Sequence, residues 1–224
     1  MNELKKNTND SINSSNTKSV GGLILAAGLS TRMGQSKPLT RFLNKKLIDQ
    51  TVKTMYDANI SNIQVVTGFE HERVETYLQS NYSSDCIHTI WNPDYGNGSI
   101  LTSIKTGLPE LADYERVFIQ LVDLPCILPE TYQQLQRAMQ ETGKKAVIPI
   151  VDGRRGHPAL ISMDLLPDIL AFESADGGGL RGFWKQLGDK LMELPVEDRG
   201  CVMDTDTKEQ LKEAENYICS RRSL

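Results

Sequence analysis

Hydrophobic and polar positions follow one another along the chain in an order that predicts strands separated by helices. Short runs rich in apolar and β-branched residues, as expected for strands of a buried sheet, occur at 20–27, 62–67, 87–91, 116–122 and 146–150. Segments with the character of helices occur at 47–60, 70–79, 100–108, 180–187 and 207–217. This alternation predicts an α/β fold of three layers, α/β/α, in which helices cover both faces of a mostly parallel, Rossmann-like sheet.

The direction of the strands predicts where a ligand binds in such a fold. Parallel strands are joined by right-handed crossovers, and ligands gather at the edge where their carboxyl ends meet. The first predicted strand ends there in a polar loop that contains glycine, so we expect the site at that edge. Residues 1–19, in contrast, are dominated by Asn, Ser, Thr and Lys, and we expect them to be a disordered extension to a single domain at 20–220.

The composition narrows the class of protein. A chain of 224 residues with 39% hydrophobic and 24% charged residues is ordinary for a soluble globular domain, and its net charge of −4 argues against a nucleic-acid binder. No apolar run approaches the roughly 18 residues of a membrane span and no signal-peptide core is present, so we expect a cytoplasmic protein. The cysteines show no zinc-ligand spacing and are expected to be buried thiols: Cys86, Cys126, Cys201 and Cys219.

The most informative stretch is 23–37, LILAAGLSTRMGQSK, in which an apolar strand gives way to a polar loop. Glycines let backbone N–H groups turn toward a phosphate, while Arg32 can grip phosphate through two nitrogens and Lys37 supplies a compact charge. Five residues separate Gly28 from Gly34, so the stretch is not a Walker A loop, and the dinucleotide pattern GxGxxG is also absent. On the residues alone, the alternative is an ordinary strand-to-helix turn with a solvated basic flank.

This stretch resembles the signature loop of the nucleotidyltransferases that carry the pattern LAAGxSxRMGxxK, with Met33 among its matching positions. The resemblance implies the nucleotide-diphospho-sugar transferase fold and a site for a nucleoside triphosphate. It also implies the residues of this loop that bind the nucleotide: Leu25, Ala26, Ala27, Gly28, Ser30, Arg32, Gly34 and Lys37.

A second loop, at 92–99, precedes a predicted helix for which Ser99 is a suitable N-cap. The free backbone N–H groups at a helix start can face a ligand above the sheet, although a plain capping role is the ordinary interpretation. In the same family, a Gly-Met-Ser-Ser-like loop at this place contacts the nucleotide base. Ile100 departs from the usual Met, and the resemblance implies nucleotide contacts from Gly98, Ser99 and Ser103.

Carboxylates at two places are candidate ligands of Mg²⁺, which takes few protein carboxylates and fills its other positions with water and phosphate oxygens. Asp123 follows a buried strand and can also be read as a strand-end cap. Its resemblance to the family's Gly/Ala-Asp-x-Pro motif favours the metal, although Val122 replaces the usual small residue. Asp204 and Asp206 resemble the closing acidic motif, in which Asp206 is the better match for a second ligand; either could instead cap the terminal helix.

Two further loops are similar to the acceptor side of one branch of this family, the molybdenum cofactor cytidylyltransferases. Gly156 and His157 belong to a Gly-His-Pro pattern that borders the acceptor pocket in that branch, and Arg155 directly precedes it. On the residues alone, a solvated hairpin tip and a turn or core histidine are the alternatives. The segment DGGGLR at 176–181 resembles a glycine loop that opens a helix, and the resemblance implies acceptor contacts from Gly178 and Arg181.

The order of these motifs resembles that of the cytidylyltransferases more than that of the sugar-1-phosphate or isoprenoid enzymes. The resemblance implies Mg²⁺-dependent transfer of CMP from CTP to molybdenum cofactor (molybdopterin), which yields the cytosine dinucleotide and pyrophosphate, for hydroxylases of the xanthine dehydrogenase type. Ala27 stands where guanylyl-transferring relatives have Gly, which favours CTP. Arg32, Lys37 and Asp123 are the expected catalytic residues, because positioning and charge stabilisation suffice without a protein nucleophile.

Two other functions fit the same residues. One is nucleotidyl transfer to another phosphorylated acceptor, such as a sugar 1-phosphate. The other is a carrier of molybdenum cofactor that keeps the fold without catalysis. An intact set of Arg32, Lys37 and Asp123 argues against the carrier, which has no evident use for a complete triphosphate and metal site.

Overall fold

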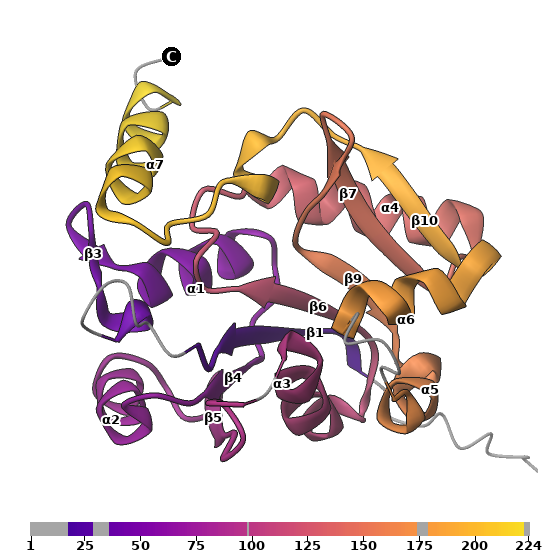
Figure 1. The fold of residues 1–224 in the computed structure, drawn as a ribbon, viewed down its shortest axis with the longest axis horizontal. Helices are drawn as coiled ribbons and strands as arrows, with labels where there is room; N and C mark the ends of the chain where they lie inside the picture. Colours follow the sequence, from indigo (N-terminus) through magenta and orange to yellow (C-terminus); the bar gives the residue numbers. More distant parts are fainter. Residues whose placement is uncertain (1–17, 29–35, 98, 174–178, 222–224) are drawn as a thin grey trace, which may run out of the picture.

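The structure, a computed structural model, describes residues 18–28, 36–97, 99–173 and 179–221 (Figure 1). Within these residues, eight strands form one sheet in the order β10-β7-β9-β6-β1-β4-β5, with the short β8 paired to β7. The strands of this sheet are β1 Lys18–Ala26, β4 Ile63–Thr67, β5 Ile87–Trp91, β6 Tyr114–Leu121, β7 Ala146–Val151, β8 Arg154–Arg155, β9 Ala159–Ser162 and β10 Leu191–Pro195.

Most neighbouring strands run parallel. β1 pairs in parallel with β4 and β6, β4 with β5, and β7 with β10. β9 lies between β6 and β7 and is antiparallel to both. The prediction of a mostly parallel α/β sheet is therefore confirmed. The reversal at β9 was not predicted, because a strand as short as Ala159–Ser162 carries too little periodicity to show its direction.

Helices cover both faces of the sheet, which confirms the three-layer prediction. One core cluster joins the sheet to α1, α2, α4 and α7, and a second joins it to α3, α5 and α6. In Figure 1, α1 and α4 lie above the central strands, and α3 and α5 lie below them. The helices are α1 Leu47–Asp57, α2 His71–Asn81, α3 Ile100–Gly107, α4 Pro129–Thr142, α5 Leu166–Ala171, α6 Gly179–Leu187 and α7 Lys208–Arg221.

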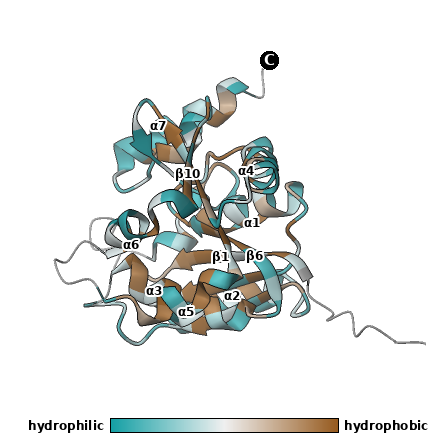
Figure 2. Cartoon of the chain, turned by 90° about the vertical axis from the view of Figure 1, so that its right-hand side faces the viewer, coloured by the Kyte–Doolittle hydropathy of each residue, from teal (hydrophilic) through white to brown (hydrophobic). Residues whose placement is uncertain are grey.

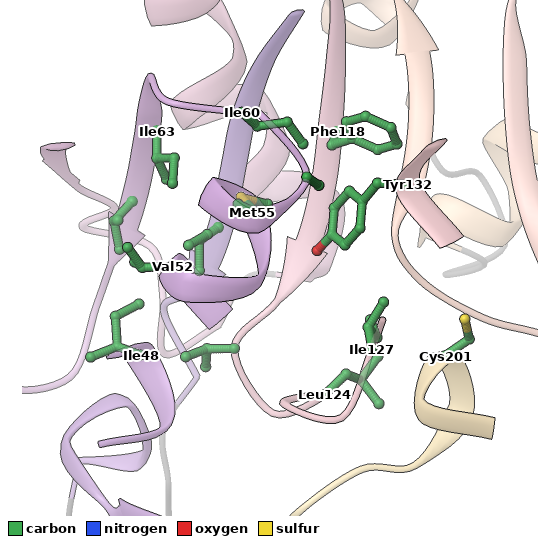
Figure 3. Packing of buried hydrophobic residues seen from close by; sticks show 14 of the residues in the cluster. Ile48, Val52, Met55, Ile60, Ile63, Phe118, Leu124, Ile127, Tyr132 and Cys201 are labelled. Atoms are coloured by element: carbon green, nitrogen blue, oxygen red, sulfur yellow. The ribbon is translucent and has the colours of Figure 1, made fainter. Parts of the chain in front are cut away.

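The core forms because the central strands are apolar on both faces. Along β1, Leu23 belongs to the second cluster and Ile24 to the first, and both are fully buried. Figure 2 shows the hydrophobic residues concentrated on the central strands. In Figure 3, Phe118 of β6 lies beside Tyr132 of α4; their rings meet edge to face at 4.9 Å, and the Tyr132 hydroxyl donates to Gln120 Oε1 at 3.1 Å.

Some boundaries differ from the predictions. β1 already begins at Lys18, inside the segment expected to be a disordered extension, and residues 1–17 lie outside the described residues. α1 ends earlier than predicted because Asn59 adopts φ 63°, a left-handed conformation that stops a helix. α4 was not predicted, although Pro129 at its start and Gly143 (φ 66°) after its end are typical helix signals.

Short elements complete the chain. A two-stranded ribbon, β2 Arg41–Phe42 and β3 Lys45–Lys46, precedes α1. The 3-10 helices are η1 Lys37–Leu39, η2 Leu108–Leu111, η3 Met163–Leu165, η4 Gly188–Lys190 and η5 Arg199–Val202. Two of them, η1 and η5, lie next to the candidate site.

None of the four cysteines forms a disulfide within the part of the chain that the structure describes. Cys126 and Cys201 are buried, which confirms that part of the prediction, and burial raises the pKa of Cys126 to about 12. Cys86 is half-buried, and the prediction was wrong for Cys219, which is exposed. Among the helices in the described ranges, none has the length and apolar content needed to cross a membrane.

Candidate active site

The carboxyl end of β1 opens into a hollow of about 230 Å³, which we call the smaller hollow. Its walls also come from η1, the start of α3 and the end of β6. Tyr95, Ile100 and Leu121 line it together with residues that the sequence assigned to the site: Leu25, Ala26, Ala27, Gly28, Lys37, Ser99, Ser103 and Asp123. The fold therefore brings the described part of the signature stretch, the helix start and the acidic strand end to one place.

The loop before α3 is held by its own polar side chains. Ser99 is the N-cap residue, as predicted, and its N–H donates to Thr102 Oγ1 at 3.2 Å. Ser103 is buried, and its hydroxyl accepts from Asn92 Nδ2 at 3.1 Å. Both serines line the smaller hollow, so capping and ligand contact are compatible roles here.

A second, larger hollow of about 670 Å³ lies at the same edge of the sheet. Ile100, Leu121 and Asp123 line both hollows, so the two spaces meet at the end of β6. The larger hollow is bordered by the residues predicted to bind the acceptor and by the second acidic pair: Arg155, Gly156, His157, Arg181, Asp204 and Asp206.

Lys37 lines the smaller hollow and pairs with acidic side chains from two other segments. Its Nζ donates to Asp123 Oδ2 at 3.1 Å and also to Asp206 Oδ1. Both carboxylates lie far from Lys37 in the sequence. Burial by itself lowers the pKa of Lys37, but the two carboxylates outweigh burial and raise it above 10.5, so the ammonium stays charged. Asp123 Oδ1 is buried and has no hydrogen-bond partner among the described residues.

The segment that carries the second acidic pair is tied to Asp123. Thr205 is fully buried, and its hydroxyl donates to the Asp123 carbonyl at 3.1 Å. α7 is capped by Thr207, whose N–H donates to Gln210 Oε1 at 2.9 Å while its Oγ1 accepts from the Gln210 N–H at 3.2 Å. Thr207 therefore takes the capping position that the sequence left open to an aspartate.

Asp204 and Asp206 differ in their surroundings. Asp206 pairs with Lys37, whereas Asp204 accepts a hydrogen bond from Gln210 Nε2. Burial, followed by the charges of Asp206 and Asp123, raises the pKa of Asp204. The negative charges of Asp206 and Asp123 make ionisation of Asp204 less favourable. A cation bound beside these carboxylates would reduce that repulsion.

The Gly-His-Pro turn packs directly against η5. The His157 N–H donates to the Cys201 carbonyl at 3.0 Å, and a Cβ on Gly156 would come within 2.5 Å of that same oxygen. His157 Nδ1 lies 3.3 Å from the Ile119 carbonyl, and burial lowers the pKa of His157 below 6.5. His157 is thus a turn histidine that also borders the larger hollow, which combines the two interpretations of its sequence.

Arginines form the basic rim of the larger hollow. Arg154 and Arg155 are exposed on β8, after a two-residue turn, so they belong to a hairpin, and both also line the larger hollow. Arg155 donates from Nε to Glu193 Oε1 at 2.8 Å, so its charge is partly balanced. Arg181, at the start of α6, makes no ion pair within the described residues. Its guanidinium remains available to an anionic ligand.

Some predicted residues lie outside the described residues: Ser30, Arg32, Met33, Gly34, Gly98 and Gly178. Sequence reasoning missed Tyr95 in the smaller hollow and Trp184 and Glu193 in the larger one. Tyr95 belongs to the turn-rich loop before α3, so its position next to predicted site residues was a usable signal. Trp184 and Glu193 reach the site only through packing, and no local pattern marks them.

Known proteins match this chain over much of its length. The MobA-like NTP transferase domain matches residues 22–191. A molybdenum cofactor cytidylyltransferase of Escherichia coli is 31% identical over 189 residues, which cover 83% of this chain and 90% of that protein. A probable molybdenum cofactor guanylyltransferase of Bacillus cereus is 29% identical over 142 residues, which cover 60% of this chain and 63% of that protein.

Solved structures share the fold. A nucleotidyl transferase from Methanothermobacter superposes with a TM-score of 0.73 at 19% identity, covering 92% of this chain and 99% of that one. A Mycobacterium tuberculosis protein in complex with manganese superposes with a TM-score of 0.65 at 17% identity, covering 89% of this chain and 99% of that one. The fold is that of the nucleotide-diphospho-sugar transferases, and the chain belongs to the MobA-like NTP transferase domain family of nucleotidyltransferases.

Proposed function

We propose that this protein transfers CMP from CTP to molybdenum cofactor, forming molybdopterin cytosine dinucleotide and releasing pyrophosphate. The observation that carries the proposal is the meeting of two hollows at Asp123, beside a lysine that bridges Asp123 and Asp206. A triphosphate in the smaller hollow and an anionic acceptor in the larger one would meet at these side chains. The similarity to the Escherichia coli cytidylyltransferase supports this substrate pair.

In the proposed reaction, a phosphate oxygen of the acceptor attacks the α-phosphorus of CTP. One P–O bond forms, and the bond from the α-phosphorus to the bridging oxygen breaks, so that pyrophosphate leaves with the electron pair. Lys37 holds a permanent positive charge at this place and stabilises charge on the phosphates, and we assign the same role to Arg32. Arg155, Arg181 and the turn around His157 would orient the acceptor.

The carboxylates fit a divalent metal. Asp123 offers a buried oxygen without a hydrogen-bond partner among the described residues, and hard carboxylate oxygens are the ligands that Mg²⁺ prefers. Among the described residues, no group of three acidic, histidine or cysteine side chains is arranged as a complete set of metal ligands. Mg²⁺ takes many of its ligands from phosphates and water. We propose that Asp123 and Asp206, with Asp204 as the weaker candidate, hold Mg²⁺. When bound, the ion would neutralise phosphate charge.

The choice of CTP rests on Ala27 and on the relatives. Ala27 is almost completely buried at the end of β1 and lines the smaller hollow. The resemblance of the signature stretch implies Gly at this position in guanylyl-transferring members of the family, so Ala27 supports CTP. We propose a single catalytic domain, which begins with β1 at Lys18 rather than at residue 20, in the cytoplasm. Its product would pass to a hydroxylase of the xanthine dehydrogenase type.

The test is pyrophosphate release with each of the four ribonucleoside triphosphates and Mg²⁺, with and without molybdenum cofactor. Turnover that requires both CTP and the cofactor is expected. Turnover with GTP instead would contradict the choice of nucleotide, and CTP turnover only with a sugar 1-phosphate would contradict the acceptor. No turnover with any triphosphate would leave the carrier as the better function.

A matched pair of variants tests the role of Asp123. Asp123→Asn is expected to lower kcat by about 100-fold or more, because a neutral amide no longer attracts a cation at the reacting phosphates. The control is Asp113→Asn, the same change at an exposed position near the opposite end of β6, which should keep normal kinetics. Full activity of the Asp123→Asn variant would refute the assignment.

A further inference from the structure

The signature stretch leaves the described residues after Gly28 and returns at Ser36, and one turn holds both flanks. This turn, Thr67–Glu70, joins β4 to α2, and we call it the bracing turn. At one flank, Gly68 packs so closely that a Cβ there would lie 2.6 Å from the Ala27 carbonyl oxygen and 2.6 Å from Tyr95 Cβ. At the other flank, the Ser36 N–H donates to Glu70 Oε2 at 3.0 Å.

Ser36, which makes this contact, directly precedes Lys37 in the chain. Ser36 is 2% exposed, and its carbonyl accepts from the Leu39 N–H at 3.1 Å and from Thr40 Oγ1 at 3.3 Å. Its two backbone polar groups are therefore satisfied on opposite sides, by Glu70 and by η1. Lys37 is the first residue of η1, so the direction of its side chain toward Asp123 depends on how Ser36 is held.

Glu70 meets this contact in an unfavourable backbone conformation. It has φ 55° and ψ 36° immediately before α2, a left-handed region in which glycine or asparagine is the usual residue. Its other carboxylate oxygen pairs with Arg73, which is 67% exposed. Glycine would fit the turn at Glu70 with less strain. We therefore infer that the carboxylate of Glu70 has a role beyond forming the turn, at its contact with Ser36.

We propose that Glu70 is a positioning residue for the nucleotidyl-transfer site: its carboxylate fixes Ser36 and thereby aims Lys37 at the reacting phosphates. The expected effect on kcat rests on the proposed function. The contact between Glu70 and Ser36 is independent of that function. Lys37 Nζ lies 3.1 Å from Asp123 Oδ2. Even a small displacement of this ammonium group would weaken its stabilisation of charge on the reacting phosphates.

Three substitutions separate this role from a contribution to folding. Glu70→Gly removes the carboxylate and also relieves the strain at φ 55°, so it should be at least as stable as Glu70→Ala and still lose activity. Both variants should lower kcat by about 10-fold or more. Glu70→Gln keeps an acceptor oxygen for Ser36 and should recover kcat to within about threefold of wild type. Arg73→Ala is the control, because it removes only an exposed ion-pair partner of Glu70.

Two readouts do not require turnover. Amide hydrogen exchange of Ser36 should accelerate by about 10-fold or more in Glu70→Ala and Glu70→Gly, because the N–H loses its partner. Calorimetric affinity for inorganic pyrophosphate should fall by about 10-fold in the same variants. Unchanged Ser36 exchange, unchanged pyrophosphate affinity or wild-type kcat in Glu70→Gly would each overturn the positioning role. Failure of the proposed function has a different signature, in which the wild-type chain releases no pyrophosphate from any triphosphate.

Discussion

Lys37 shows how individual residues acquire their properties from neighbours that are distant in the sequence. Its side chain is only 15% exposed, and burial of a lone ammonium would favour the neutral amine. The carboxylates of Asp123 and Asp206, which lie 86 and 169 residues away along the chain, reverse that effect and raise its pKa. The charged state of Lys37 is therefore a property of the folded site rather than of the signature loop.

His157 gives a prediction for the pH dependence of stability. Its pKa is lowered in the folded protein because burial disfavours the imidazolium, so folding favours the neutral form. This contribution to stability is fully present above the unfolded pKa of about 6.5 and is lost as the pH falls through the lower folded pKa. The free energy of unfolding should therefore decrease below about pH 6.5.

The variant that isolates this effect is His157→Asn, whose amide nitrogen replaces Nδ1 as a donor for the Ile119 carbonyl but does not titrate. Urea unfolding of both proteins between pH 7.5 and 5, at about half-unit steps, should show a smaller loss of stability in the variant. Parallel pH profiles for the two proteins would contradict the assignment.

At the scale of elements, η5 holds the site together from the side of the C-terminal segment. Asp198, just before η5, is 5% exposed and accepts from the Leu128 N–H at 2.7 Å and from Thr131 Oγ1 at 2.8 Å, both at the start of α4. Its other oxygen accepts from Arg221 Nη2 of α7 at 3.3 Å. The carboxylate at the start of α4 also suits the positive end of that helix.

Gly200 provides the test of this packing. A Cβ at Gly200 would lie 2.2 Å from the Cys126 carbonyl oxygen and 2.7 Å from the Ile127 nitrogen, and backbone atoms cannot rotate away as a side chain can. Gly200→Ala is therefore expected to destabilise the protein by about 2–3 kcal/mol. Urea unfolding measures this change, and it should appear as a lower midpoint at a similar slope.

The matched control is Gly96→Ala, since a Cβ at Gly96 would meet no heavy atom within 4 Å. Its stability should stay within about 0.5 kcal/mol of wild type. Equal stability of the two alanine variants would mean that η5 is not packed against this backbone.

At the scale of the whole molecule, the two halves of the sheet border different hollows. β1 borders the smaller hollow through its carboxyl end, while β7, β8 and the segment around η5 border the larger one. β6 lies in the middle, and Leu121 at its end and Asp123 two residues later line both hollows. Substitutions in the two halves should therefore affect the two substrates separately.

Arg181→Ala tests this separation. Loss of a charged donor at the rim of the larger hollow should raise the KM for molybdenum cofactor by about 10-fold, with the KM for CTP nearly unchanged. Steady-state pyrophosphate release with each substrate varied in turn measures both constants. The control is Arg137→Ala on the exposed side of α4, and an equal rise in both KM values for the Arg181 variant would argue against two separate subsites.

Much of the fold and of the site followed from the sequence alone. The apolar runs that became β1, β4, β5, β6 and β7 predicted a mostly parallel sheet, because strands buried on both faces must be apolar throughout. The signature stretch and Asp123 predicted the edge where ligands bind, because strand ends of a parallel sheet converge there. These features depend on local composition and spacing, which the sequence displays directly.

Only the tertiary structure decided how distant segments meet. Several contacts join residues that are far apart in the chain. They are the antiparallel pairing of β9, the salt bridges from Lys37 to Asp123 and Asp206, the hydrogen bonds of Asp198 and the contact of Glu70 with Ser36. Such contacts depend on the order and register of strands and on side-chain packing, to which no local period corresponds. The sequence by itself determined the class of fold and the chemistry of the loops, and the packing of the folded chain decided which side chains act together.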